Sequence, residues 1–262
     1  MTLPASYFGW VAAGTESMPE DEKPAGVLLP IITRFVHLSA YARSNVFGDG
    51  RRDSADLIEQ ALQLDAELER WEREATGKWV FTLHEDKELP AKACFHGRYH
   101  VYADMWAARI WSHHRWARIL VNQMILEFVD TYPTSGVRTV SAAQQSRCLA
   151  EIRRLARDVL ISVPTHVKHP LLTADQRAKI QTHGGSGAGA AGVPATLFHL
   201  KVAACAPGVP REYWTWALSI METVWGDMGM LQAKSLAEVL RAHQDALQRG
   251  SADGILKIEP VW

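Results

Sequence analysis

The chain has 262 residues and a formal net charge of −1, so it lacks the basic excess that drives binding to nucleic-acid phosphates. Hydrophobic residues make up 47% and charged residues 22%, which is typical of a globular protein and argues against global disorder. The three cysteines, Cys94, Cys148 and Cys205, lie far apart. This argues against a disulfide framework or a thiolate zinc site and favours a reducing, intracellular compartment.

The chain begins with a segment that predicts an irregular arm over residues 1–26. It holds three prolines and an acidic run at 20–22, and it has no basic region followed by the apolar run of a secretion signal. The longest apolar stretches of the chain are broken by His, Arg or Lys before they reach the length that crosses a bilayer. We therefore expect no membrane partner.

The next two segments have helical periodicity. Residues 27–47 carry apolar side chains at helical spacing, and Gly48-Asp49-Gly50 ends that pattern. Asp53 or Ser54 is a candidate N-cap for the following helix. Its predicted buried stripe steps by four and three residues through Leu57, Ala61, Leu64, Leu68 and Trp71. The stretch 79–90 is short and mixed, and it predicts irregular structure.

The strongest helical signal runs from Ala93 to Asp130, which predicts a long central helix, mostly buried. Further apolar periodicity predicts helices that start at 139–141 and run to about 160, then at 197–204, 210–227 and 230–248. Convincing alternating strands are absent from the sequence pattern. We expect an all-α fold, with about seven helices in a single multi-helix domain over residues 27–262.

Three polar residues of the long predicted helix are candidate catalytic groups: Asp104, Arg109 and His113. Trp106, Arg109 and His113 are spaced by three and four residues, so they share one helix face. A guanidinium and an imidazole on such a face need partners, because burial without partners costs free energy. The pattern is typical of a general acid or base in an aromatic pocket. The alternative is a helix-packing arrangement with one ring exposed.

Charged residues are a second feature of this helix. Asp104, Arg109, Arg115, Arg118 and Glu127 interrupt a helix that is apolar on several sides. If the helix is central, some of them must be paired or must face a pocket.

Aromatic and histidine side chains supply the candidate ligand-binding residues. The chain has ten tryptophans and eleven histidines, and each indole N–H needs a partner when it is buried. So many aromatic residues suit a broad helical core or the wall of an aromatic pocket. The predicted ligand-binding set is Tyr99, His100, Tyr102, Trp106, Trp116 and Trp214.

Two motifs are weighed and set aside. His96 and His100 are four residues apart, which would place two imidazoles on one helix face, as in many metal sites; no HExxH arrangement accompanies them. Gly187 to Gly192 matches GxGxxG, but the pattern has neither a preceding strand nor the expected acidic residue. We expect no metal and no cofactor.

The basic residues Arg147, Arg153, Arg154 and Arg157 predict a solvated face, with a docking surface as the alternative.

Several segments together resemble the fungal-specific transcription factor domain, which is found behind zinc-cluster DNA-binding modules. They are Leu64–Trp71, Tyr102–Trp111 with His114–Leu120, Asp158–Pro164, Val209–Trp214, and Met228–Leu240 in part. Their order and spacing follow that family over roughly residues 57–240. The resemblance implies an all-helical regulatory domain.

The chain departs from that family at the DNA-binding module, which needs six cysteines around two zinc ions. This chain has three, unclustered, so we expect no direct binding to nucleic acid. Two hypotheses remain. The first is a regulatory or effector-sensing domain, nuclear, acting through a protein partner or a homodimer. The second is a cytoplasmic, cofactor-free cyclase, isomerase or dehydratase of secondary metabolism on the same scaffold. In both, the expected ligand is a small-molecule effector or substrate.

Overall fold

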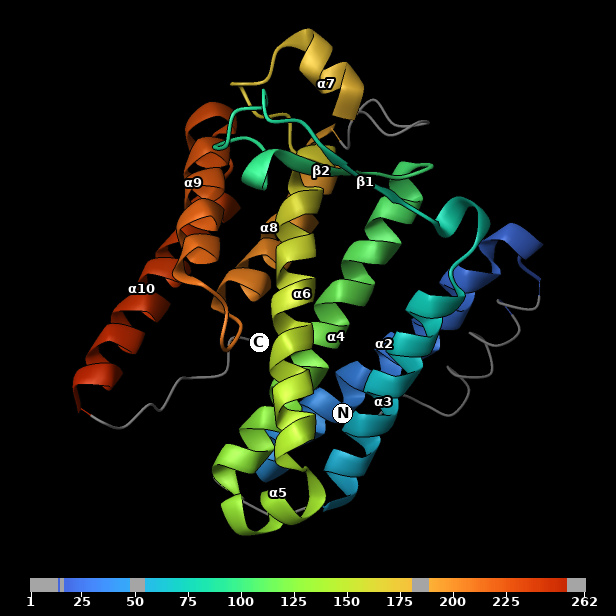
Figure 1. Ribbon diagram of the computed structural model, residues 1–262, viewed down its shortest axis with the longest axis vertical. Coiled ribbons are helices and arrows are strands. Elements are labelled where there is room, and N and C mark those ends of the chain that lie inside the picture. The colour runs from blue at the N-terminus through green and yellow to red at the C-terminus, as the bar shows by residue number, and fades with distance from the viewer. Residues whose placement is uncertain (1–13, 15–16, 48–54, 181–188, 254–262) are drawn as a thin grey trace. The chain divides into compact units, whose positions relative to one another are not determined.

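The computed structural model of the chain describes residues 14, 17–47, 55–180 and 189–253. Helices dominate these residues, and the expected all-α class is confirmed (Figure 1). The α-helices are α2 (Lys23–Tyr41), α3 (Ala55–Glu74), α4 (Met105–Thr131), α5 (Pro133–Thr139), α6 (Ala142–His166), α7 (Ala174–Ile180), α8 (Gly189–Cys205), α9 (Arg211–Met228) and α10 (Leu231–Asp253). A π-helical turn, η2 (Ala42–Val46), continues α2, and short 3-10 turns lie at Glu20–Glu22, Gly77–Trp79 and Phe95–Gly97.

The chain divides into two compact units, and neither is a continuous stretch of sequence. Unit 1 comprises residues 1–80 and 117–152, and unit 2 comprises residues 81–116 and 153–262. Both α4 and α6 therefore contribute residues to each unit. The break in α4 falls between Trp116 and Ala117.

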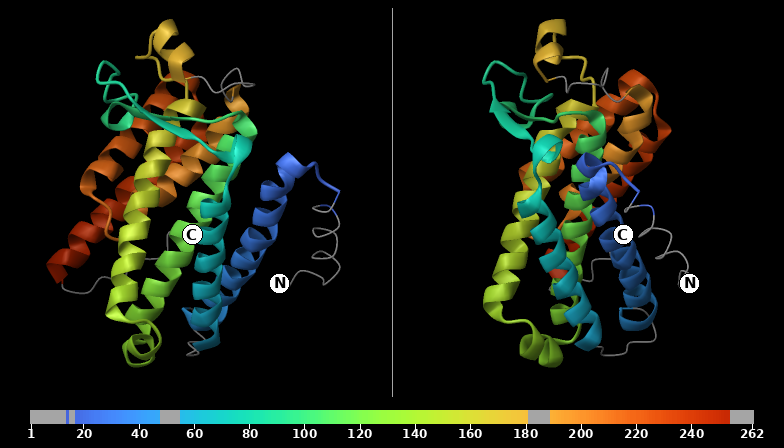
Figure 2. Two further views of the ribbon diagram at one scale, coloured as in Figure 1. Left: turned by 45° about the vertical axis from the view of Figure 1, so that its right-hand side comes forward. Right: turned by 90° about the vertical axis from the view of Figure 1, so that its right-hand side faces the viewer.

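Unit 1 is built on the packing of α2 against α3, which lie side by side in both views of Figure 2. The predicted stripes are confirmed here, since each predicted apolar residue is buried. On α3 these are Leu57, Ala61, Leu64, Leu68 and Trp71, and on α2 they include Leu28, Ile31, Phe35 and Leu38. The helix starts at Lys23 rather than at residue 27, because Pro24 occupies its first turn, where proline is tolerated.

Unit 2 contains the one structural feature that the sequence pattern missed most clearly, a two-stranded antiparallel sheet. Strand β1 (Thr82–Glu85) pairs with β2 (Arg98–Val101), with Leu83 opposite His100. The first dozen residues of the predicted helix over 93–130 therefore form a turn and a strand. Gly97 explains the change: its φ is +67°, and a Cβ there would lie 2.7 Å from the backbone oxygen of Asp86. A left-handed residue of this kind ends a right-handed helix.

The remaining elements of unit 2 are helices. α9 packs against α10, and α8 packs against both. Two short helices, α5 in unit 1 and α7 in unit 2, are additions to the predicted set. α6 extends through Pro164 to His166, and α8 begins eight residues before the predicted helix at 197. Residues 181–188, which precede α8, lie outside the described residues.

Four tryptophans hold elements together through their indole N–H groups. Trp71 and Trp79 of unit 1 donate to the backbone oxygens of Pro24 and Asp21, each at 2.7 Å. In unit 2, Trp216 donates to Ala91 O at 2.8 Å and Trp214 donates to Leu240 O at 2.9 Å. Each of these indole N–H groups is hydrogen-bonded to a backbone oxygen of another segment. Packing therefore explains part of the tryptophan excess.

Among the residues that the structure describes, one helical stretch, Glu20–Val46, is long and apolar enough to cross a membrane by length and composition. Half of its most apolar window is buried, and it lies near the N-terminus. Buried core helices pass the same test. The expectation that the chain has no membrane partner stays a prediction.

Candidate functional site

The predicted catalytic face of α4 is not turned inward. Trp106 is 47% exposed, Arg109 is exposed, and His113 is half-buried. The prediction that these three side chains point together into the protein is therefore wrong. The buried side of this half of α4 carries Trp111 and Arg115 instead.

Asp104 has a structural contact that differs from its predicted catalytic role. Its carboxylate accepts a hydrogen bond from the backbone N–H of Ala107 at 2.7 Å, and its backbone oxygen accepts one from Ala108 at 3.2 Å. Asp104 directly precedes Met105, the first residue of α4. This is the geometry of an N-cap, in which a side-chain oxygen satisfies a free donor of the first turn.

The structure places a different group in the interior of unit 2, the guanidinium of Arg115. The residue is only 1% exposed. Nη1 donates to the Tyr102 hydroxyl at 2.6 Å, and Nη2 lies 3.4 Å from Nδ1 of His100. Thr165 on α6 binds the backbone oxygen of His100 at 2.7 Å, which fixes β2 against α6. Two predicted ligand-binding residues, His100 and Tyr102, are thus brought together around an arginine.

Aromatic rings surround this guanidinium. Its central carbon lies 4.9 Å from the ring centroid of Phe81, 5.4 Å from that of Trp111 and 5.8 Å from that of Tyr102. Phe81 and Trp111 also meet edge to face at 4.8 Å. Cation–π attraction offsets part of the cost of removing the charge from water. It does not replace a counter-ion.

His100 is a neutral hydrogen-bond acceptor in this arrangement. Burial, with Arg115 and Arg157 nearby, lowers its pKa to about 2. Its Nδ1 faces both the Arg115 guanidinium and the Tyr102 hydroxyl, the latter at 3.2 Å. An arginine can only donate, so this contact assigns the lone pair to Nδ1 and the proton to Nε2.

Two further buried imidazoles complete the site. His166 at the end of α6 lies with Nε2 3.4 Å from the Ser112 hydroxyl oxygen. His199 on α8 packs edge to face on His113, with ring centroids 5.1 Å apart. Within the described residues, Nδ1 of His166 and Nδ1 of His199 are buried without a hydrogen-bond partner. Such atoms are rare in native proteins and mark places where a water or a ligand binds.

Burial lowers the pKa values of these imidazoles, and nearby cationic groups lower them further. Burial, with Arg115 and Arg109 nearby, lowers the pKa of His166 to about 4. Burial, with His113, His166 and Arg115 nearby, lowers that of His199 to about 3. Burial and Arg109 also lower the pKa of His113. We call Arg115, His100, Tyr102, Ser112, His166 and His199 together the Arg115 cluster.

The Arg115 cluster is basic, and its guanidinium has no ion pair in the part of the chain that the structure describes. Asp158 is the carboxylate that acts electrostatically on Tyr102. Asp158 forms ion pairs with Arg154 at 3.4 Å and Arg157 at 3.9 Å. A buried cation held by neutral acceptors and aromatic rings favours a bound anion, because the anion supplies the missing charge.

The other predicted ligand-binding residues lie around or away from this cluster. Trp116 lies beside Phe198 and His199, with centroids 6.2 Å and 6.3 Å away. Tyr99 belongs to a separate apolar cluster with Leu89, Ala93, Cys94, Leu172 and Ile180. Trp214 joins α9 to α10, as described above, so its contact is one of packing.

The two motifs that were set aside do not form sites in the described residues. His96 is in a 3-10 turn with φ 54°, and His100 is in β2, so they do not share a helix face as their spacing implied. No group of three or more His, Cys, Asp or Glu among these residues could hold a metal ion. Of the GxGxxG match, Gly187 and Ala188 lie outside the described residues, and α8 begins at Gly189.

Two surface hollows lie elsewhere, in unit 1. One has a volume of about 610 Å³ and the other about 760 Å³, and residues of α2 and α3 line both. None of the predicted site residues lines either hollow. The buried chemistry of unit 2 and the surface hollows of unit 1 are therefore separate features.

The buried histidines predict a dependence of stability on pH. An unfolded imidazole takes up a proton below about pH 6.5, whereas folded His166 and His199 stay neutral until about pH 4 and 3. The unfolded state therefore binds more protons as the pH falls, and the free energy of unfolding should decrease from about pH 6.5 downward. In a His199→Asn variant this slope should flatten by up to about 1.4 kcal/mol per pH unit.

Urea unfolding at several pH values measures this slope. His96→Asn is the matched control, because the His96 side chain is 54% exposed and asparagine accepts a left-handed backbone. A His199→Asn slope as steep as that of the control would contradict the assignment of His199 as a buried neutral base.

Comparison of the chain with protein-family models, with curated proteins and with solved structures finds no match in any of the three.

Proposed function

We propose that this chain is an effector-sensing, regulatory helical domain whose effector is a small organic carboxylate bound at the Arg115 cluster of unit 2. The observation that carries the proposal is the Arg115 guanidinium, buried among aromatic rings without an ion pair in the described residues. The resemblance to the fungal-specific transcription factor domain supports the regulatory part. In this role the chain acts through a protein partner or a homodimer and has no direct contact with nucleic acid.

The chemistry of the cluster favours a carboxylate that also carries a ring and a hydroxyl group. A carboxylate matches the planar donor fork of a guanidinium, and the rings of Phe81 and Trp111 lie beside that guanidinium, so the surroundings suit a ligand with an aromatic ring. A ligand hydroxyl can donate to Nδ1 of His166 or His199, which have no partner among the described residues. An aromatic hydroxy acid combines these three features.

Effector sensing follows from linkage between binding and stability. A ligand that binds only the folded state stabilises it by RT ln(1 + [L]/Kd), or about 2.7 kcal/mol at a hundred times Kd. The bound anion would neutralise the buried guanidinium and so stabilise unit 2. A protein partner that binds only the stabilised form would then respond to the effector.

Thermal unfolding with 4-hydroxybenzoate as the probe tests the proposal. We expect the melting temperature to rise with the concentration of the acid and to stay constant with 4-hydroxybenzamide, its neutral analogue of the same shape. The comparison isolates the negative charge, which is the property that the guanidinium selects. An equal response to both compounds, or none to either, would refute the carboxylate assignment.

A second candidate function is a cofactor-free cyclase, isomerase or dehydratase. The observation that favours it is the pairing of half-buried His113 with buried His199, because neutral imidazoles can carry protons between solvent and a bound substrate. Incubation of protein and probe in D₂O distinguishes the two. The enzyme hypothesis predicts deuterium at a carbon of the probe, detected by mass spectrometry after the O–H groups have exchanged back in H₂O, and lost in His199→Asn. The sensing hypothesis predicts that the probe is recovered without deuterium at carbon.

A further inference from the structure

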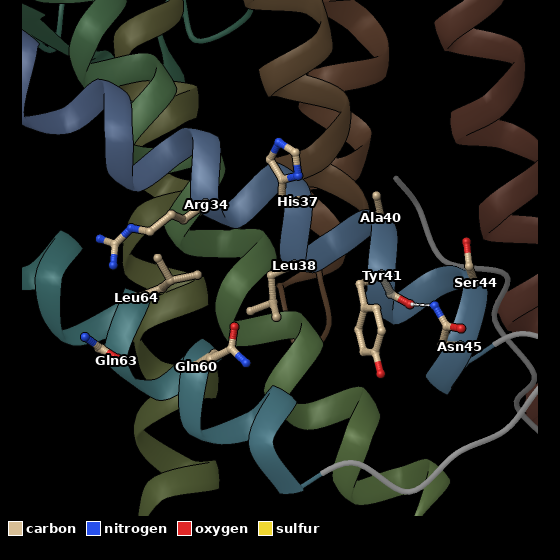
Figure 3. Close-up of a pocket in the computed structure, with 10 residues that line it drawn as sticks. All are labelled: Arg34, His37, Leu38, Ala40, Tyr41, Ser44, Asn45, Gln60, Gln63 and Leu64. Carbon is tan, nitrogen blue, oxygen red and sulfur yellow. Dashed lines mark hydrogen bonds between the residues drawn. The ribbon is translucent and has the colours of Figure 1, made fainter. Parts of the chain in front are cut away.

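The smaller of the two hollows in unit 1 has the features of a second binding site. Its volume of about 610 Å³ lies within the range of small-molecule pockets. Two apolar residues, Leu38 on α2 and Leu64 on α3, contribute to its lining. Figure 3 shows Leu38 and Tyr41 extending from α2 toward the side on which Gln60 extends from α3.

The polar lining of this hollow consists mainly of uncharged groups. Side-chain amides come from Asn45, Gln60 and Gln63, and hydroxyl groups come from Tyr41 and Ser44. Each amide offers both donors and an acceptor, which is the pattern that complements ligand hydroxyl groups.

The charged residue Arg34 lies at one end of the hollow and is paired with Glu67. The pair carries no net charge, so it exerts little preference for an anion. The lining therefore favours a neutral ligand.

A π-helical turn of the backbone positions two of the residues that line this hollow. The turn η2 is π-helical, and its N–H···O bond spans five residues from Phe47 N to Ala42 O, at 2.9 Å. Tyr132 supports the turn by donating its hydroxyl to Val46 O at 2.6 Å. π-Helical turns cost stability and occur frequently at functional sites. This one presents Ser44 and Asn45 at the hollow, three and four residues after the exposed ring of Tyr41.

We infer that this hollow binds a neutral, hydroxyl-rich ligand such as a sugar or a polyol. The ring of Tyr41, which is 48% exposed, would pack against the C–H face of the ligand, and the amides of Gln60 and Asn45 would pair with its hydroxyl groups. The site lies in unit 1 and is independent of the carboxylate site proposed for unit 2.

Saturation-transfer NMR with maltose, cellobiose and myo-inositol, each at millimolar concentration, tests the inference. We expect transfer from the protein to at least one of them. Tyr41→Ala and Gln60→Leu should each weaken that binding by about tenfold, equivalent to about 1.4 kcal/mol. Both side chains are exposed, so the variants should fold, and circular dichroism verifies this.

Gln248→Leu serves as the control, since Gln248 is exposed on α10 and lies outside the lining of the hollow. It should bind as the unmodified chain does. The inference is overturned if none of the three probes receives saturation, or if either Tyr41→Ala or Gln60→Leu retains full binding.

Discussion

Replacing Arg118 with methionine should lower the free energy of unfolding by about 3–5 kcal/mol, the cost of breaking a buried ion pair from one side. The Arg118 side chain is 6% exposed and contacts Asp65 at 3.0 Å, Glu72 at 2.8 Å and Glu151 at 2.8 Å. These carboxylates come from α3 and α6, so one guanidinium joins three helices of unit 1. Without it, three partly buried carboxylates lose their common counter-ion and repel one another.

Urea unfolding measures this change, with Arg34→Met as the control. Arg34 is also paired with a carboxylate, that of Glu67, but its side chain is 41% exposed, so we expect a cost below about 1 kcal/mol. A cost no larger than that of the control would contradict the structural role of this network.

Replacing Arg115, three residues earlier, with methionine should leave the stability unchanged or raise it, and it should weaken ligand binding strongly. Arg115 makes no ion pair among the described residues. Methionine would remove a buried charge while the Tyr102 hydroxyl and His100 Nδ1, 3.2 Å apart, could still satisfy each other. Replacement of a buried ion by an apolar side chain is often neutral or stabilising, so stability should stay within about 1 kcal/mol or rise.

Binding of 4-hydroxybenzoate should nevertheless fall by at least about 100-fold in Arg115→Met, because two charge-assisted hydrogen bonds contribute about 1.5–3 kcal/mol each. Calorimetric titration of the acid measures the affinity, and urea unfolding measures the stability. Retained affinity in a folded Arg115→Met variant would exclude Arg115 as the carboxylate-binding group. A large loss of stability would show that the guanidinium is a packing element with a partner.

The fold was predictable from sequence wherever one helix face is apolar and the other polar. The α2 and α3 stripes follow from residues such as Leu28, Phe35, Leu64 and Trp71, each buried as expected. The hairpin was not predictable, because β2 is four residues long and its pairing with β1 depends on contacts distant in sequence. The left-handed residues His96 and Gly97 mark the point where helical periodicity stops applying.

The candidate site was predicted in residue type but not in position. Between Ala117 and Val121 every residue of α4 is buried, so periodicity there cannot tell which face continues inward. The face that was predicted to point inward, through Trp106, Arg109 and His113, therefore proved to be the more exposed side of the first half of α4. A charged residue in an apolar helix was the useful signal, and it applied to Arg115 and Arg118. His166 and His199 belong to other helices, and no local pattern connects them to Arg115.

A structure of the chain bound to 4-hydroxybenzoate tests the central proposal most directly. We expect the carboxylate within hydrogen-bond distance of the Arg115 guanidinium, the ring beside Phe81 and Trp111, and the phenolic hydroxyl toward His166 or His199. A carboxylate bound away from Arg115, including one in the hollow between α2 and α3, would contradict the account.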